Sequence, residues 1–236
     1  MIANLSIYIS VFFGLTTFLT LFLFAKATAT PPQYMERPNT IGKTFLGVTI
    51  GWLLLQMLIS LTGFYQETSI TTPPRLFLAV APTLLGIAAL FFTEKGQHFI
   101  ESLDVKALTY LHVVRIPVEL TLFWLYQNGQ IPEVMTFEGR NFDIFAGITS
   151  PFIAYFGFTK KSISPTLILV WNFICLGLLF NIVIHAVLSI QSPMQQMAFD
   201  QPNRAILFFP FVWFPSVVVP LVLLAHLVVV KRLLKK

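Results

Sequence analysis

Four polar residues of segment 107–127 could do chemistry inside a membrane. His112, Arg115, Glu119 and Tyr126 interrupt an otherwise apolar run, and at 3.6 residues per helical turn they fall within about 60° of one another. Arg115 and Glu119 are four residues apart, so they can pair along the helix. Because an ionisable group inside a span must face protein or water, this stripe indicates either an ion pair between helices or a site for a substrate, ion or proton.

Two other apolar segments carry polar residues. Asn181 and His185 lie four residues apart on one face of segment 166–190, and Gln56 lies deep within segment 44–64. Such residues commonly form hydrogen bonds between helices, each worth about 0.6 kcal/mol. The alternative interpretation is that they line a pocket.

Two polar connections are unusually rich in charge for a chain in which only 11% of residues are charged. The first contains Glu138, Arg140 and Asp143, and the second contains Asp200 and Arg204. Either they form a solvated surface that pairs with itself, or they form a lid or rim over a pocket.

No motif in the sequence identifies a catalytic or cofactor site. There is no glycine-rich phosphate loop, no HExxH, no GxSxG and no Cys-x-x-Cys, and the single Cys175 lies in an apolar run where a small buried side chain is expected. We therefore predict no cofactor and no metal, and enzymatic activity is not favoured. One alternative is a pair of axial haem ligands from His112 and His226, the two histidines that could meet inside a bundle.

Seven apolar segments must position these residues. The chain is 56% hydrophobic, with a mean hydropathy of +0.79, whereas soluble domains have about 25% charged residues. At 1.5 Å per residue, about 20 apolar residues cross the hydrocarbon core. The predicted spans are 3–25, 44–64, 76–93, 107–127, 142–159, 166–190 and 207–230. Segments 76–93 and 142–159 are short and contain Pro and Gly, so we expect them to be kinked or partly re-entrant.

The distribution of Lys and Arg predicts the orientation of these spans. Eleven lie in the connections on one side, three lie on the other side, and Arg115 lies inside a span. The eleven are Lys26, Arg37, Lys43, Lys95, Lys106, Lys160, Lys161, Lys231, Arg232, Lys235 and Lys236. Because positive residues stay in the cytoplasm, we predict an all-α, polytopic transmembrane bundle over residues 1–236, with the N-terminus outside and the C-terminus cytoplasmic.

The positive charge also predicts the partners. The C-terminal run VKRLLKK suits anionic lipid of the inner leaflet, and the other basic residues flank apolar segments. We therefore expect the lipid bilayer and possible membrane protein partners, and no nucleic acid.

Three stretches of the second half of the chain, VVRIPVEL, MTFEGRNFDIFAG and AFDQPNRAILFFPFVWFP, resemble an uncharacterised family of bacterial seven-helix membrane proteins. The resemblance implies a bacterial inner membrane location. It implies no activity and no functional residues.

The leading hypothesis is an outward-facing polar pocket that binds or transports a small polar or lipid-headgroup ligand. It would be built from Arg115, Glu119, His185 and the two charged connections, all of which the predicted orientation brings toward the outer face. One alternative is a structural or sensory subunit of a larger membrane complex. Another is an intramembrane enzyme that acts on a lipid or isoprenoid, with Glu119 or His185 as acid or base.

Overall fold

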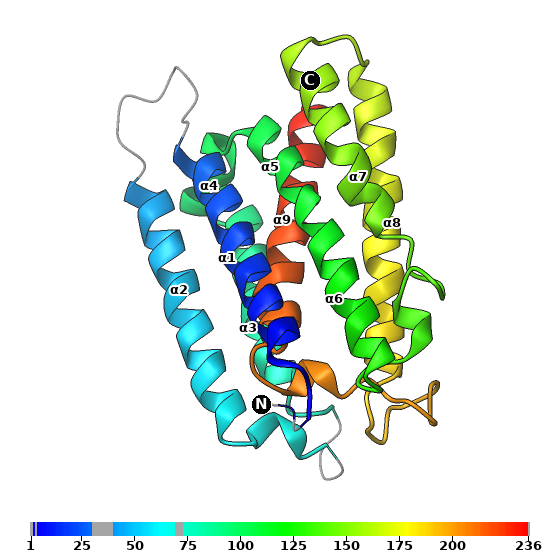
Figure 1. Ribbon diagram of the computed structural model, residues 1–236. Helices are drawn as coiled ribbons and strands as arrows, with labels where there is room; N and C mark the ends of the chain where they lie inside the picture. The colour runs from blue at the N-terminus through cyan, green and yellow to red at the C-terminus, as the bar shows by residue number, and fades with distance from the viewer. Residues whose placement is uncertain (1, 3, 30–39, 69–72, 236) are drawn as a thin grey trace.

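The computed structural model describes residues 2, 4–29, 40–68 and 73–235, and over this part of the chain it is helical, without β-strands. Long helices run side by side, and the two termini lie at opposite ends of the bundle (Figure 1). The α-helices are α1 (Ile7–Ala29), α2 (Thr40–Leu61), α3 (Phe77–Phe92), α4 (Glu94–Ser102), α5 (Val105–Leu111), α6 (Arg115–Gln127), α7 (Ile144–Phe152), α8 (Pro165–Leu188) and α9 (Val219–Leu234). The predicted all-α class is confirmed.

Several of these helices are long and apolar enough to span a membrane. Within the described residues, five qualify: α1, α2, the run α5–α6 over Val105–Gln127, α8, and the run Phe214–Leu234 that ends in α9. A sixth span exists if α3 and α4 are counted together, and Ile144–Thr159 is a shorter apolar helix. The protein is therefore a multi-pass membrane protein by helix length and composition, but the count of seven full-length spans is not confirmed.

The segment 76–93 ends in a sharp bend rather than in a loop. The chain turns by 90° between α3 and α4. Thr93 has extended backbone angles, and its hydroxyl accepts a hydrogen bond from the Gly96 amide at 3.2 Å, which caps the start of α4. A Cβ at Gly96 would lie 2.4 Å from the Leu90 Cα, so only glycine allows the two helices to meet this closely.

The run that carries Arg115 is helical throughout, but it tightens in the middle. A 3-10 turn, η2 (His112–Val114), joins α5 to α6. Pro117 has no N–H to donate to the carbonyl four residues earlier, which agrees with a local change of winding at this point. Arg115 thus lies near the middle of the run Val105–Gln127.

The last helix begins seven residues later than predicted and extends further. Ala205–Leu207 form a short 3-10 turn, η5, and a π-helical turn, η6 (Phe214–Val218), leads into α9. Pro215 and Pro220 lie in the first turns of η6 and α9, where a missing N–H is tolerated. The prolines therefore mark starts of helical elements. The later end, at Leu234 rather than at residue 230, also moves His226 away from the end of the helix toward its middle.

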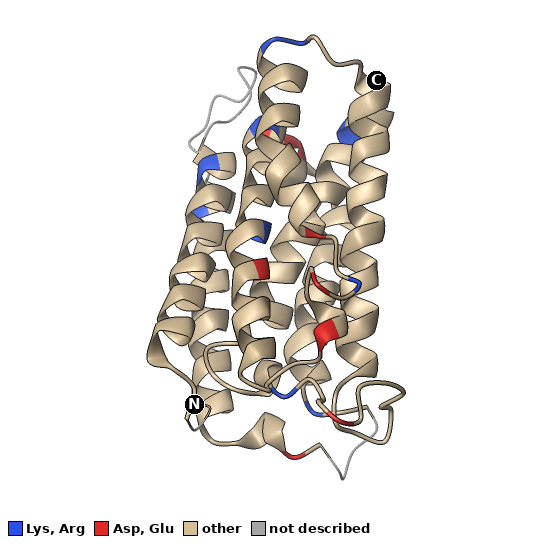
Figure 2. Ribbon diagram, turned by 45° about the vertical axis from the view of Figure 1, so that its right-hand side comes forward, with Lys and Arg blue, Asp and Glu red and all other residues tan. Residues whose placement is uncertain are grey.

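Charged residues separate along the bundle axis. Most Lys and Arg positions lie toward the end that contains the C-terminus, whereas Asp and Glu positions are spread from that end to the opposite loops (Figure 2). Of the eleven basic residues on the predicted inner side, Arg37 and Lys236 lie outside the described residues. The arrangement agrees with the charge asymmetry of the sequence, and the orientation of the termini stays a prediction.

Candidate functional site

Arg115 is the centre of a buried polar cluster. Its side chain is only 2% exposed, and its Nη1 donates to the Asp143 carboxylate at 2.7 Å. The same nitrogen lies 3.3 Å from the Cys175 carbonyl oxygen, and Nη2 lies 3.0 Å from Nε2 of His226. Elements from three parts of the sequence therefore converge on one guanidinium group.

The predicted pairing of Arg115 with Glu119 is wrong. The carboxylate that pairs with Arg115 belongs to Asp143, 28 residues away and directly before α7. Gly147 allows this approach, because a Cβ there would lie 2.8 Å from Cγ1 of Ile116 and 3.3 Å from Cβ of Arg115. The start of α7 thus packs close enough to α6 for Asp143 to reach Arg115.

The hydrogen bonds of His226 define its tautomer. Because Arg115 can only donate, Nε2 of His226 must accept, and Nδ1 then carries the proton. That Nδ1 donates to Oδ1 of Asn172 at 2.9 Å, and the Asn172 amide nitrogen donates to the Ile168 carbonyl at 2.9 Å. The series of hydrogen bonds from Arg115 through His226 and Asn172 to Ile168 therefore joins α6, α9 and α8, and the donor and the acceptor of each bond are known.

His112 stacks face to face on His226, with ring centroids 3.8 Å apart and planes inclined by 19°. Trp171 contacts the edge of this pair. Axial haem ligands must instead point their nitrogens at one iron from opposite sides, and Nε2 of His226 already accepts from Arg115. The haem alternative therefore does not fit this geometry.

Glu119 lies in the same cluster but has its own partner. It is 1% exposed, and its Oε1 accepts a hydrogen bond from the side-chain amide of Asn141. Among the described residues no group bonds to Oε2 of Glu119, to Nε of Arg115 or to either ring nitrogen of His112. A void of about 10 Å³ touches Arg115, Glu119 and Asp143, which is room for about one water molecule.

Two connections, residues 128–143 and 190–204, close the end of the bundle nearest Glu119, and we call them the cap. Asn141 is fully buried and also donates to the Met135 carbonyl at 3.1 Å. The second connection packs on the first, since the Arg204 amide donates to the Gln130 carbonyl at 3.0 Å and the Gln201 side chain donates to the Ile131 carbonyl at 2.5 Å. The cluster is therefore covered from this side.

The predicted site residues lie in four different places. Arg115, Glu119 and Asp143 meet in the cluster, whereas Glu138, Arg140, Asp200 and Arg204 are exposed on the cap. Asn181 and His185 lie between these groups: the Asn181 amide donates to the Arg140 carbonyl at 2.8 Å, and His185 bonds the Asn181 carbonyl at 2.8 Å.

Gln56 lies elsewhere. It is buried at the end of α2, where its Oε1 accepts a hydrogen bond from the Tyr65 hydroxyl. Its amide therefore ties α2 to the turn η1 (Phe64–Gln66).

Two members of the cluster are absent from the predicted ligand set. Asn141 bridges Glu119 and the cap, and Asn172 orients His226. A signal for Asn172 exists, because it is a polar residue in an apolar helix on the face opposite Asn181. Asn141 has no such signal, because it is one of several polar residues in a loop.

Comparison with known proteins gives a family but no activity. Residues 73–234 match the family model described as a domain of unknown function, DUF8737. No curated protein and no solved structure matches the chain. The matched residues include every member of the cluster and of the cap, and α1 and α2 precede them. Since the match covers more than half of the chain, this multi-pass membrane protein belongs to the DUF8737 family.

Proposed function

We propose that this protein binds a small ligand that donates hydrogen bonds, with Glu119 as its acceptor, in the buried cluster beneath the cap. The observation that carries the proposal is the unpartnered Oε2 of Glu119 beside a void that also touches Arg115 and Asp143. A buried acceptor without a partner costs about 1–3 kcal/mol, and more if it is charged.

The charges of the cluster define the chemistry of this ligand. Arg115 and Asp143 compensate each other at 2.7 Å, and among the described residues Glu119 has only the neutral Asn141 amide as a hydrogen-bond partner. A second carboxylate inside a span is costly unless a proton, a cation or a donor compensates it. A proton or an amine meets this requirement, and the amine can belong to a free molecule or to a lipid headgroup.

The small size of the void means that ligand entry requires movement of the cap. About 10 Å³ admits one water molecule and no amine, so the cap must move before a larger ligand enters. With the N-terminus outside, as the basic residues predict, the cap faces the outside of a bacterial inner membrane. The ligand then enters from that side, and the present structure is the closed form.

Labelling with dicyclohexylcarbodiimide tests the site, since this apolar reagent modifies protonated carboxyl groups within membranes. The full-length protein in lipid nanodiscs is treated and the modified residue is identified by mass spectrometry. We expect labelling at Glu119, loss of labelling in Glu119→Gln, and undiminished labelling in Glu138→Gln, which changes an exposed carboxylate on the cap.

Competition with amines tests the ligand chemistry. Methylammonium should slow the labelling of Glu119, whereas tetramethylammonium, which has no N–H, should not. Protection by ethanolamine would extend the site to headgroup amines. Absence of labelling at Glu119, or equal protection by tetramethylammonium, would contradict a donor-binding site.

A role as a subunit of a membrane complex is the second candidate. Its support is α2, of which only 17% is buried, compared with 61% of the run Val105–Gln127. Val48, Leu54 and Leu58 on α2 are more than half exposed, so one whole helix offers an apolar surface to lipid or to another protein. The test is purification of the protein from native membranes in a mild detergent. A complex subunit should co-purify with a partner protein in a fixed ratio. If the double variant Leu54→Ala/Leu58→Ala no longer co-purifies with this partner, the contact lies on α2.

A further inference from the structure

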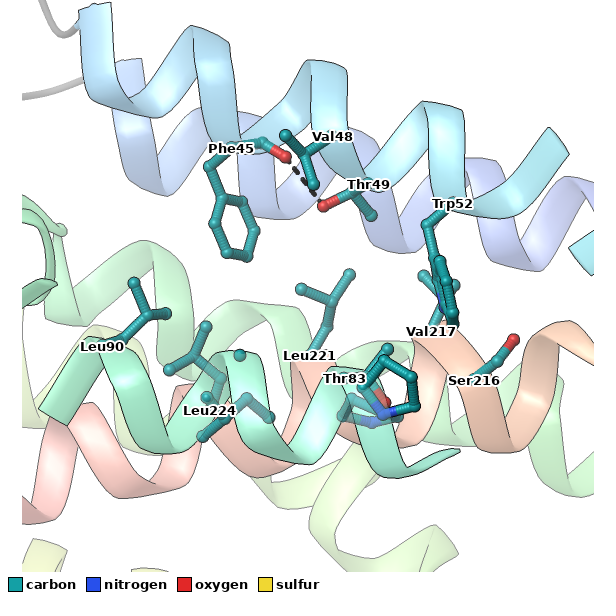
Figure 3. Close-up of a pocket in the computed structure, with 14 residues that line it drawn as sticks. Phe45, Val48, Thr49, Trp52, Thr83, Leu90, Ser216, Val217, Leu221 and Leu224 are labelled. Carbon is teal, nitrogen blue, oxygen red and sulfur yellow. Dashed lines mark hydrogen bonds between the residues drawn. The ribbon is translucent and has the colours of Figure 1, made fainter. Parts of the chain in front are cut away.

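A second cavity lies on the far side of α9 from the charged cluster. It has a volume of about 420 Å³ and is lined by α2, α3, η6 and α9. In Figure 3, Phe45 and Trp52 of α2 point toward Val217 and Leu221 across the cavity, and Leu90 of α3 lies at one end. Its volume is within the range of ligand sites, about 300–1,000 Å³.

This cavity opens sideways, between two helices. α2 packs against α1, η1 and η6, and α3 packs against α4, η6 and α9, so η6 is the neighbour that the two helices flanking the cavity share. Val48 on α2 is 67% exposed, and Gly86 on α3 is exposed as well. A molecule dissolved in the lipid can therefore enter without crossing the cap.

The lining offers one free polar group. The hydroxyls of Thr49, Thr83 and Ser216 all donate to carbonyls of their own helical turns, at 2.7–2.9 Å. The indole Nε1 of Trp52 is buried and has no hydrogen-bond acceptor among the described residues. Because Nε1 has almost no accessible surface in this structure, the Trp52 ring must turn toward the cavity before an acceptor oxygen on an apolar molecule can reach it.

The depth of Trp52 excludes an ordinary phospholipid as the source of this acceptor. Trp52 lies nine residues before the end of α2 and twelve after its start, hence about 13–18 Å from either end at 1.5 Å per residue. This is near the centre of a hydrocarbon core of about 30 Å. Ester carbonyls of phospholipids stay at the interface, so only their acyl chains, which have no acceptor, reach this depth.

We propose that this lateral cavity binds an isoprenoid quinone, whose ring carbonyl accepts the hydrogen bond of Trp52 while its chain fills the apolar lining. Quinones combine the three required properties: they dissolve in the middle of the bilayer, they enter between helices, and they carry carbonyl acceptors on an apolar ring. The inference does not depend on the function proposed for the charged cluster.

The probe is decylubiquinone added to the full-length protein in nanodiscs, with binding measured as ligand-dependent thermal stabilisation. Trp52→Phe keeps an aromatic ring and removes the donor, and we expect it to weaken binding about five- to tenfold, as for one lost hydrogen bond. Gly86→Leu places a side chain at the cavity, where a Cβ meets nothing within 4 Å, and should weaken binding more than tenfold.

Three controls make the outcome decisive. Gly177→Leu makes the same change at an exposed glycine of α8 with open space and should bind like the unchanged protein, as should Glu138→Gln, which changes an exposed carboxylate of the cap. Dodecylbenzene has a similar chain and ring without carbonyls and should bind the unchanged protein more weakly than the quinone. Equal stabilisation by both molecules would show that the cavity holds only hydrocarbon chains. Undiminished quinone binding in Trp52→Phe and Gly86→Leu would show that the quinone binds elsewhere, and either result would overturn the proposal.

Discussion

Arg115 and Asp143 show how a full charge is accommodated in the middle of an apolar bundle. The pair is nearly inaccessible, at 2% and 6% side-chain exposure. Each ion loses hydration on burial, so the pair adds little stability by itself, but removal of one partner leaves an uncompensated charge. The polar residues around the pair, among them Asn172 and Asn141, therefore act chiefly to form hydrogen bonds with the groups of the cluster and to orient them.

We predict that Asp143→Asn destabilises the protein by about 3–5 kcal/mol, because it leaves Arg115 without its counter-ion in the interior. The measurement is a denaturant or thermal unfolding curve of the detergent-solubilised protein. Asp200→Asn removes a carboxylate from the exposed surface of the cap and should change stability by less than about 0.5 kcal/mol.

A double variant separates the charge penalty from packing. Arg115→Met/Asp143→Leu replaces both ions with apolar side chains, so it should be clearly more stable than Arg115→Met or Asp143→Leu alone. Additive losses in the double variant would show that the ion pair is not the reason for the sensitivity of these positions.

At the scale of elements, the close contact between α6 and α7 places Asp143 against Arg115. Gly147→Ala is predicted to destabilise the protein by about 1–3 kcal/mol, because its Cβ would lie 2.8 Å from Ile116 and the helices must separate. Gly177→Ala should be neutral or stabilising by up to about 1 kcal/mol, since alanine favours helix and meets nothing within 4 Å. Thermal unfolding of both variants checks this prediction. Equal changes in the stability of the two variants would contradict it.

The end of α9 is attached to α4 by two contacts. Lys235 donates to the Glu101 carboxylate at 2.6 Å, and Arg232 donates to the Glu101 carbonyl oxygen at 2.6 Å. The hydrogen bond from Lys235 lowers the pKa of Glu101 below its ordinary value. A carboxyl group of lowered pKa contributes stability above its unfolded pKa, and this contribution disappears as the pH falls through the folded pKa.

We therefore predict a small loss of stability, below about 1 kcal/mol for so exposed a pair, as the pH falls below the ordinary range of a glutamate. Unfolding curves of the unchanged protein and Lys235→Gln, measured between pH 6 and 3, should differ at the upper end and converge at the lower end. Lys161→Gln, at an exposed position in the loop before α8, should run parallel to the unchanged protein at every pH.

At the scale of the whole molecule, the unequal distribution of Lys and Arg gives the protein a direction. We predict that the connection 160–164 and the C-terminus face the cytoplasm and that the cap faces outward. In bacterial cells that express a Cys175→Ser background, a membrane-impermeant maleimide should label Asp200→Cys and not Lys161→Cys. The reverse pattern would contradict the orientation and would place the entrance to the charged cluster inside the cell.

The sequence was sufficient for the features that depend on local composition. Apolar length predicts α1, α2 and α8 to within a few residues, because hydrocarbon thickness sets the length of a span. The same reasoning fails near Phe214, since most of the apolar residues 207–213 form turns between η5 and η6 rather than a helix, and hydropathy does not distinguish buried turns from helix. It predicts α3 to within one residue at each end but not the sharp bend into α4, because that bend depends on the contact of Gly96 with Leu90.

By itself, the sequence determined that an arginine, a glutamate and a histidine share one face of a membrane helix, since that depends only on helical periodicity. Only the tertiary structure decided which groups satisfy them. Arg115 bonds to Asp143 and His226, which are 28 and 111 positions away, and spacing along one helix carries no information about such partners. The same long-range packing covers Glu119 with Asn141 and leaves Trp52 unpartnered, and on these two features both proposals rest.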